Sequence, residues 1–328
     1  MNVLVTGGAG YIGSHLVHVL KHGEHGVVVV DDLSAGHRDA VPDGVPFVHA
    51  DVRDASAVRA AIREHSVTAI VHFASRIQVG ESVRDPRLYY RDNLVAGIQL
   101  LESALDENVR TFVLSSTAAV YGDPEYTPID EAHRTVPVNP YGATKLALEG
   151  VLASYATAYG LRYAALRYFN ASGARADRGL AERHDPETHL IPLVLDAAMG
   201  ARPSLTVFGE DYATPDGTCV RDYIHVSDLA DAHLAALSHL AAGGTSGAWN
   251  LGTGKGYSVR EVIAAVEQVT GRKVPVEKGA RRAGDPPVLV AAPEKARGAF
   301  GWVARRSGLL DIVRDAYLAR FPSPSPAR

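Results

Sequence analysis

The chain has 328 residues, of which 46% are hydrophobic and 21% charged, a composition typical of a globular protein rather than a disordered or fibrous one. Its net charge of −4 provides no basic field for binding nucleic acid or an anionic membrane. A single cysteine, Cys219, excludes an internal disulfide framework and a site with several cysteine ligands. No HExxH motif or similar spacing among the fourteen histidines favours zinc, so we expect no metal.

The first residues, MNVLVTGG, contain neither a basic segment nor a long apolar one. No later segment approaches the ~18 apolar residues of a membrane span. We therefore expect a cytoplasmic protein that contacts neither membrane nor nucleic acid.

Short apolar runs rich in β-branched residues alternate with segments of helical spacing along the first half of the chain. The runs are 3–7, 27–32, 45–51, 68–75, 111–116 and 163–170, and the helical segments between them include 12–20, 55–65 and 141–159. This alternation predicts an α/β fold with a doubly wound parallel sheet of Rossmann type, covered by helices on both faces. We assign residues 1–170 to a dinucleotide-binding domain.

The rhythm changes after Asn170, because 171–220 is rich in glycine, proline and charged residues. We expect 171–320 to form mainly a smaller α/β lobe that binds substrate, with some elements returning to the sheet. WNLG (249–252) is predicted as such a strand, and SVRE (258–261) as a capping box that opens a helix. The remaining 321–328, rich in proline and serine, is predicted to be a flexible tail.

A glycine-rich turn predicts a dinucleotide site. Gly7, Gly10 and Gly13 form G-x-x-G-x-x-G between the first strand and the first helix, where glycines permit a tight turn and the helix N-terminus binds pyrophosphate. Asp31 ends the next strand, where a carboxylate accepts hydrogen bonds from ribose hydroxyls and repels a 2′-phosphate, so we expect NAD rather than NADP. GTGKG (252–256) lacks the P-loop spacing and is expected to be a simple turn.

NPYGATK (139–145) places Tyr141 and Lys145 one helical turn apart. A phenol with a pKa near ~10 is a poor base, but a neighbouring ammonium and an oxidised nicotinamide ring favour its phenolate. Thr117 follows a predicted strand, so its hydroxyl should emerge where ligands of such sheets bind, although it could equally cap a turn. The order of these motifs favours a catalytic site over a solvated surface pair.

Eight stretches of the sequence together resemble the extended short-chain dehydrogenase/reductases, a family of NAD-dependent epimerases and dehydratases. They are TGGAGYIG, DDLSAGH, FAS…VGES, SSTAAVYG, NPYGATK, LRYFNASG, VRDYIHVSDLA and RRAGDPP, spread from residue 3 to about residue 287. Within the family, the set is most similar to the enzymes that interconvert UDP-galactose and UDP-glucose at C4. The resemblance implies a homodimer formed through paired helices.

The resemblance implies roles for individual residues. Tyr141 would act as the base with help from Thr117, and Lys145 would hold the nicotinamide ribose. The positions that match cofactor contacts are Gly7, Gly10, Tyr11, Ile12, Gly13, Asp31, Asp32, Leu33, Ser34, Gly36, Asp51, Val52, Phe73, Ala74, Ser75, Asn93, Ser115, Tyr141, Lys145 and Tyr168. Those that match contacts to the UDP-sugar are Thr117, Tyr141, Asn170, His189, Leu190, Thr206, Val207, Phe208, Arg221, Arg282 and Asp285.

The sequence also departs from the pattern of some relatives. Ile77 stands where some carry a lysine, so contact of that segment with the cofactor phosphates would need Arg76 instead. Leu289 falls near the position where a tyrosine restricts some members to glucose and galactose, which suggests that UDP-N-acetylhexosamines are also accepted.

Three other functions share features with this sequence. Nucleotide-sugar 4,6-dehydratases carry Asp-Glu directly after the threonine, whereas Ala118 and Ala119 stand here, which argues against dehydration. Epimerisation of a UDP-uronate is not distinguished by the sequence. A non-catalytic NAD-binding regulator would have no need for Thr117, Tyr141 and Lys145 together.

Overall fold

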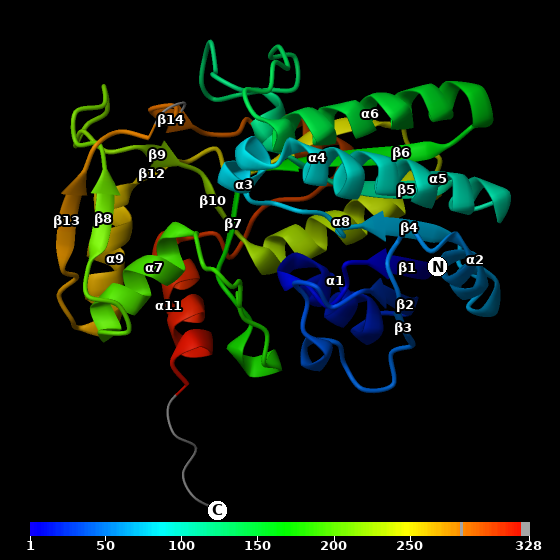
Figure 1. Cartoon of the computed structure of the whole chain (residues 1–328), viewed down its shortest axis with the longest axis horizontal. Helices are drawn as coiled ribbons and strands as arrows, with labels where there is room; N and C mark the ends of the chain where they lie inside the picture. The colour runs from blue at the N-terminus through cyan, green and yellow to red at the C-terminus, as the bar shows by residue number, and fades with distance from the viewer. Residues whose placement is uncertain (283–284, 323–328) are drawn as a thin grey trace, which may run out of the picture.

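A computed structural model describes residues 1–282 and 285–322 of the chain. Its centre is a seven-stranded parallel sheet with the order β11-β6-β5-β4-β1-β2-β3 (Figure 1). The strands are β1 (Asn2–Thr6), β2 (Gly26–Asp31), β3 (Phe47–His49), β4 (Ala69–His72), β5 (Thr111–Thr117), β6 (Arg162–Tyr168) and β11 (Gly247–Leu251). Successive strands are added on one side of β1 as far as β3 and then on its other side from β4 onward. The boundary between β1 and β4 is therefore the switch point at which such sheets bind ligands. The predicted doubly wound Rossmann fold is confirmed.

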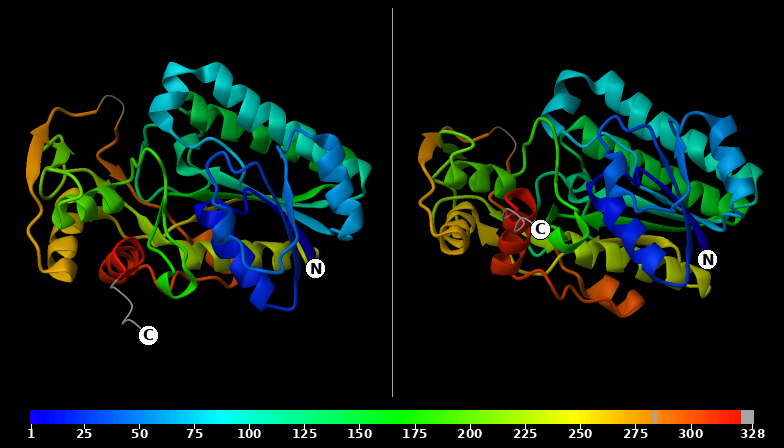
Figure 2. Two further views of the ribbon diagram at one scale, coloured as in Figure 1. Left: turned by 60° about the horizontal axis from the view of Figure 1, so that its bottom comes forward. Right: turned by 90° about the horizontal axis from the view of Figure 1, so that it is seen from below.

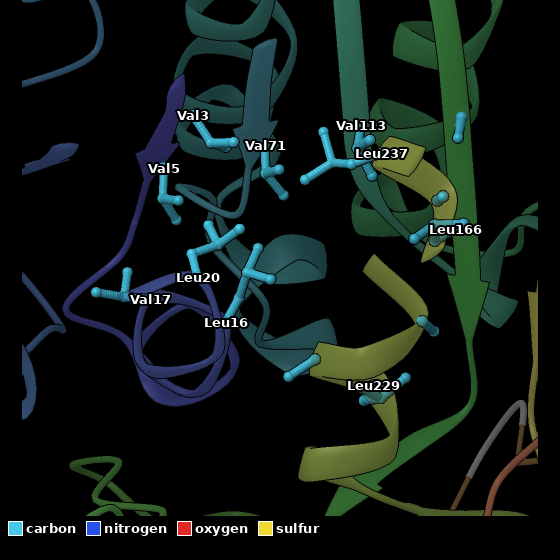
Figure 3. Packing of buried hydrophobic residues seen from close by; sticks show 14 of the residues in the cluster. Val3, Val5, Leu16, Val17, Leu20, Val71, Val113, Leu166, Leu229 and Leu237 are labelled. Carbon is cyan, nitrogen blue, oxygen red and sulfur yellow. The ribbon is translucent and has the colours of Figure 1, made fainter. Parts of the chain in front are cut away.

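Alternating side chains of the strands supply two hydrophobic cores, one on each face of the sheet. Val3 and Val5 of β1 lie in one cluster with Leu16 of the helix that follows β1 and with Leu229 (Figure 3). Leu4 belongs to the cluster on the other side. Every one of these side chains is fully buried. Both faces are apolar because helices cover both, as expected for an all-parallel sheet.

The helices lie on the two faces as the clusters indicate. α1 (Tyr11–His22) and α8 (Val226–Ala241) contact each other on one face, with α10 (Glu294–Phe300) against α8. The other face carries α2 (Ala55–Glu64), α5 (Ala96–Asp106) and α6 (Pro140–Tyr159). Between β4 and α5 the chain forms α3 (Val79–Arg84), α4 (Pro86–Tyr89) and a π-helix, η2 (Tyr90–Val95).

Small sheets and helices lie beside the large sheet (Figure 2). β7 (Asn170–Ser172) pairs with β10 (Tyr223–His225), β8 (Leu205–Phe208) pairs with β13 (Val276–Gly279), and β9 (Val220–Arg221) lies between β12 (Tyr257–Ser258) and β14 (Val288–Leu289). A third hydrophobic core joins α7 (Leu190–Met199), α9 (Val259–Thr270) and α11 (Leu309–Arg320). The helix α7 lies within the stretch in which the sequence shows few clean periods.

Two later elements match the predictions closely. β11 pairs with β6 in parallel, so the strand predicted at 249–252 does return to the sheet. The Ser258 side chain accepts from the Glu261 N–H while Glu261 accepts from the Ser258 N–H, which is the predicted capping box at the start of α9. Of the predicted tail 321–328, residues 323–328 lie outside the described residues. Within the described part of the chain, no helix combines the length and apolarity needed to cross a membrane.

Candidate active site

The glycine turn between β1 and α1 is packed too tightly for side chains. A Cβ on Gly7, whose φ is +70°, would lie 2.5 Å from the backbone nitrogen of Ala74, and one on Gly13 would lie 2.2 Å from the Gly7 carbonyl oxygen. Gly10, the N-cap of α1, has no side chain to accept from the first-turn N–H groups. Those N–H groups and the dipole of α1 suit a pyrophosphate, so the residues present fit a dinucleotide.

Asp31 ends β2 beside this turn and helps to hold its shape. One carboxylate oxygen accepts from the Ala9 N–H at 2.9 Å and the other from the Leu33 N–H at 2.8 Å. Burial raises the pKa of the Asp31 carboxyl, and the two backbone hydrogen bonds oppose that rise. Each oxygen keeps a lone pair that could accept from a ribose hydroxyl.

The start of α6 positions the predicted catalytic tyrosine. Asn139 caps the helix by accepting from the Gly142 N–H at 2.9 Å, and Pro140 occupies the first turn, where its missing N–H costs nothing. A Cβ on Gly142 would lie 2.4 Å from the Ala119 carbonyl oxygen. Only glycine therefore allows α6 to approach the end of β5 this closely. The motif NPYGATK includes Gly142, but the sequence alone assigns this glycine no role.

Tyr141 and Thr117 are brought together at this contact. Burial raises the pKa of the Tyr141 phenol, and its hydrogen bond with the Thr117 hydroxyl acts in the opposite direction. The Thr117 oxygen also accepts from the Ala119 N–H at 3.1 Å. Thr117 therefore has both predicted roles in the structure: it caps a turn, and it is a hydrogen-bond partner of Tyr141.

Lys145 lies one turn further along α6 and is buried, with 1% of its surface exposed. Its ammonium donates to the Ser75 hydroxyl at 2.9 Å and to the Ser115 carbonyl oxygen at 2.8 Å, which joins α6 to the ends of β4 and β5. Burial lowers the pKa of Lys145 to about 7, against the attraction of Glu149. The Ser115 hydroxyl is hydrogen-bonded to Tyr168, whose pKa burial raises.

A buried ion pair between Arg167 of β6 and Glu149 of α6 lies one helical turn beyond Lys145. The Arg167 guanidinium donates to both carboxylate oxygens of Glu149, at 2.5 Å to one of them, and Glu149 also accepts from the Ser116 hydroxyl at 2.5 Å. Arg167 further donates to the Tyr121 hydroxyl at 3.0 Å. The network ties α6 to β5 and β6. The sequence did not predict this network, although Glu149 stands one turn after Lys145.

The other predicted cofactor residues lie in the segments that follow β1 to β4, with Asn93 in the π-helix η2. Tyr11 donates its hydroxyl to the Gly173 carbonyl oxygen at 2.6 Å, and the Asn93 side chain binds the backbone of Arg76 at 2.8 and 3.0 Å. Core packing or loop contacts account for the rest of the side chains, since Val52, Phe73 and Ala74 pack on the two sheet cores and Asp51 pairs with Arg53. The remaining positions, Ile12, Asp32, Leu33, Ser34 and Gly36, lie at the start of α1 and in the loop after β2.

Arg76 is engaged by neighbouring carboxylates. Its guanidinium lies 2.7 Å from Asp92 and 3.9 Å from Glu81. Ile77 beside it is 40% exposed. A contact of Arg76 with cofactor phosphates would therefore compete with the Asp92 pair.

A second group of predicted residues gathers beside β8, β9 and β14. Arg221 donates to the Asp285 carboxylate, and the Arg282 guanidinium lies 4.0 Å from the centre of the exposed Phe208 ring. The Cys219 thiol lies 3.9 Å from Asp285, and burial raises its pKa. The residues 283–284 between the two lie outside the described part of the chain. Two arginines beside an aromatic ring suit a nucleoside diphosphate.

The remaining predicted substrate residues differ in their exposure. Val207 is buried in the third core, Thr206 pairs with Glu277 across β8 and β13, and Leu190 packs on the same core at the start of α7. Asn170 donates to the Asp222 carbonyl oxygen at 3.0 Å. His189 lies between two carboxylates: burial lowers its pKa, but hydrogen bonds to Glu182 and Glu187 outweigh this and raise it to about 10.

The fold and site define a dinucleotide-dependent enzyme of the short-chain dehydrogenase/reductase type, with tyrosine, lysine and threonine at the sheet edge. A sequence profile of the NAD dependent epimerase/dehydratase family matches residues 3–252. The chain belongs to that family.

Proteins similar to this chain include enzymes named for one reaction. The UDP-glucose 4-epimerase of Halalkalibacterium halodurans is 49% identical over 318 residues, which cover 97% of this chain and 95% of that protein. The UDP-glucose 4-epimerase of Brucella ovis, solved in complex with NAD, has a TM-score of 0.94 at 49% identity and covers 96% of this chain and 97% of its own. The enzyme of the same name from Stenotrophomonas maltophila, with bound NAD and formylated UDP-arabinopyranose, has a TM-score of 0.94 at 43% identity and 98% coverage of both chains.

Proposed function

We propose that this chain is an NAD-dependent UDP-hexose 4-epimerase that interconverts UDP-galactose and UDP-glucose. The observation that carries the proposal is the meeting of Thr117, Tyr141 and Lys145 at the carboxyl edge of the sheet, beside a turn that fits a pyrophosphate. Ala118 and Ala119 follow Thr117 where a dehydratase needs an acid, so the site has no group there to expel a hydroxyl.

The proton chemistry is assigned to Tyr141. Its phenolate takes the proton of the sugar 4-hydroxyl. After the 4-keto sugar has turned about its diphosphate linkage and presents its other face, the Tyr141 phenol returns a proton to the C4 oxygen. Thr117 donates to or accepts from the same oxygen and orients the sugar hydroxyl. NAD, when bound, supplies the acceptor and donor of the C4 hydride, so the overall reaction needs no external reductant.

Lys145 holds the reacting groups in place. Its ammonium, fixed by Ser75 and Ser115, attracts the Tyr141 phenolate and would bind the hydroxyls of the nicotinamide ribose. Arg221 and Arg282 would bind the diphosphate by charge-assisted hydrogen bonds. Phe208 would stack on the uracil ring or pack against the ribose.

Proton NMR of the purified protein with UDP-galactose, without added reductant, tests the proposal. We expect the anomeric signal of UDP-glucose to grow to a fixed ratio with no net NADH. No change with NAD supplied would refute UDP-galactose as the substrate. Turnover of a UDP-uronate in the same assay would replace the proposed substrate by the charged sugar.

The environment of Leu289 bears on the size of the sugar. Leu289 pairs with Arg221 through β9 and β14 and packs against a small cluster formed by Val120, Tyr121 and Ile129. A leucine is smaller than a tyrosine, so we propose that UDP-N-acetylhexosamines are also epimerised. Finding no turnover of UDP-GlcNAc while UDP-glucose reacts would contradict this extension. Leu289→Tyr should then abolish the UDP-GlcNAc reaction selectively.

Two further statements stay predictions. We propose a homodimer, as expected from the resemblance, and its mass in solution by light scattering tests it. We also expect the enzyme in the cytoplasm, which localisation of a tagged chain tests.

A further inference from the structure

Four side chains in one short segment meet away from the catalytic helix, beside Tyr11 at the start of α1. Glu182, His184, Glu187 and His189 each offer one nitrogen or oxygen atom, and these four atoms lie within 4.8 Å of one another. The segment leads from η4 (Ala176–Arg178) into α7. The spacing E-x-H-x-x-E-x-H is not a helical zinc motif, which is why the sequence did not single it out.

Three of the separations are somewhat shorter than the edges of a tetrahedral zinc site. His189 Nδ1 lies 2.8 Å from Glu182 Oε1 and 2.9 Å from Glu187 Oε1, and His184 Nδ1 lies 3.2 Å from Glu182 Oε1. With bonds of ~2.1 Å to a tetrahedral zinc ion, neighbouring donor atoms lie ~3.4 Å apart. These three pairs would open by a few tenths of an ångström around one ion, and any wider pair, up to the 4.8 Å that bounds the group, would close around it.

One buried oxygen of the cluster lacks a partner. Among residues 1–282 and 285–322, Glu187 Oε2 has no hydrogen bond. The side chains of Glu182 and Glu187 are each only 8% exposed. Buried polar atoms normally have a partner, and a cation would give one to this oxygen.

The nearby arginines do not neutralise the two carboxylates. Arg320 binds both oxygens of Asp196 at 2.6 and 2.7 Å, and Arg183 binds both oxygens of Asp39 at 2.9 and 2.7 Å. No arginine of the described residues that lies beside the cluster binds Glu182 or Glu187 directly, so a divalent cation would supply the countercharge for both carboxylates.

We propose that Glu182, His184, Glu187 and His189 bind a zinc ion through two imidazole nitrogens and two carboxylate oxygens. Imidazole nitrogen favours zinc over magnesium and calcium, which prefer oxygen ligands. The proposal replaces the expectation from sequence that no metal is bound, and it assigns the His189 side chain to the ion in place of the UDP-sugar contact that the resemblance implied.

A bound ion would fix the segment against the cofactor turn. The His184 ring lies edge-on to Tyr11, the first residue of α1, with ring centres 6.0 Å apart. His189 immediately precedes Leu190, which begins α7. The ion would therefore join the loop that leads to α7 to the N-terminus of α1, so its role is structural.

Calorimetric titration of the NAD-loaded full chain, after dialysis against a chelator, tests the site. We expect one equivalent of ZnCl₂ to bind and to raise the melting temperature, and MgCl₂ to do neither. His184→Gln and Glu187→Gln should each weaken zinc binding at least ~10-fold. The matched control is the double variant His18→Asn/His22→Asn, which removes a surface histidine pair stacked on α1 and should titrate as the wild type does.

Each outcome decides the question. Absence of zinc binding to the wild-type chain overturns the proposal whether or not the variants fold. Wild-type affinity in both cluster variants also overturns it, as does loss of binding in the His18/His22 control alone. Circular dichroism of each variant separates loss of ligand from loss of fold.

Discussion

Replacing Gly142 by alanine would move the catalytic helix away from the strand that carries Thr117. The new Cβ would lie 2.4 Å from the carbonyl oxygen of Ala119 and 2.9 Å from its carbonyl carbon. Both are backbone atoms of η3 (Ala118–Val120), so no side chain can rotate to relieve the contact. Reaching an ordinary separation of about 3.4 Å requires a shift of about 1 Å, and a misplacement of this size can lower a rate about 100-fold. We expect kcat to fall by about that factor.

The same helix provides a matched control. A Cβ on Gly150 would meet nothing within 4 Å, so Gly150→Ala adds the same methyl group to α6 without a clash. Its helix propensity should stabilise the protein by up to ~1 kcal/mol and leave kcat unchanged. The assay is kcat and KM for UDP-galactose, with circular dichroism to establish that both variants are folded. Wild-type kcat in folded Gly142→Ala would refute the argument that this contact positions Tyr141.

Three more substitutions test other parts of the site. Tyr141→Phe keeps the packing and removes the proton carrier, so kcat should fall ~10²–10⁴-fold while NAD stays bound, as its absorbance and fluorescence would report; near-normal turnover would remove Tyr141 from the mechanism. Lys145 has a pKa of about 7 when folded and ~10.5 when unfolded, so the unfolded chain binds more protons between these values and the stability that Lys145 contributes rises with pH there. Urea unfolding at pH 7 and pH 9 should show the stability difference between Lys145→Met and wild type shifting by roughly 2 kcal/mol in favour of the wild type, and a pH-independent difference would contradict the buried cation. Gly7→Ala places a Cβ 2.5 Å from Ala74 N at a φ of +70°, so the purified variant should lose NAD, and a full complement of NAD would refute the tight turn.

Local pattern was enough to predict the strands of the large sheet and three of its helices, α1, α2 and α6. The β-branched runs of β1 and β2 and the glycine turn between them encode a buried parallel strand, a turn and a helix without reference to the rest of the chain. α7 escaped prediction because it is nearly all apolar and follows a long irregular loop, so its sequence carries no helical contrast of apolar and polar faces. The small paired strands β9, β12 and β14 are two residues long, too short for any period to appear.

The site was predictable where a motif joins adjacent residues, and unpredictable where partners are distant in sequence. Tyr141 and Lys145 share one helix, so their spacing alone predicts proximity. Glu149 and Arg167 lie on an α-helix and a β-strand, and only the packing of α6 on β6 brings the two together. The contact of Gly142 with Ala119 likewise depends on a backbone approach that no propensity encodes.

The electrostatics of the buried pair suggest how one tyrosine serves as both base and acid. Burial raises the pKa of the Tyr141 phenol, so the protein alone holds it protonated, and Lys145, whose pKa burial lowers to about 7, is only partly charged at neutral pH. The positive charge of an oxidised nicotinamide ring would favour the Tyr141 phenolate, and that charge disappears once the ring carries the hydride. The Tyr141 phenol would therefore hold its proton more tightly while the ring carries the hydride, and would become a stronger proton donor once the ring has returned the hydride and regained its charge. The direction of proton transfer is then set by the oxidation state of the neighbouring ring, which is what a reaction that removes and returns the same hydrogen equivalents requires.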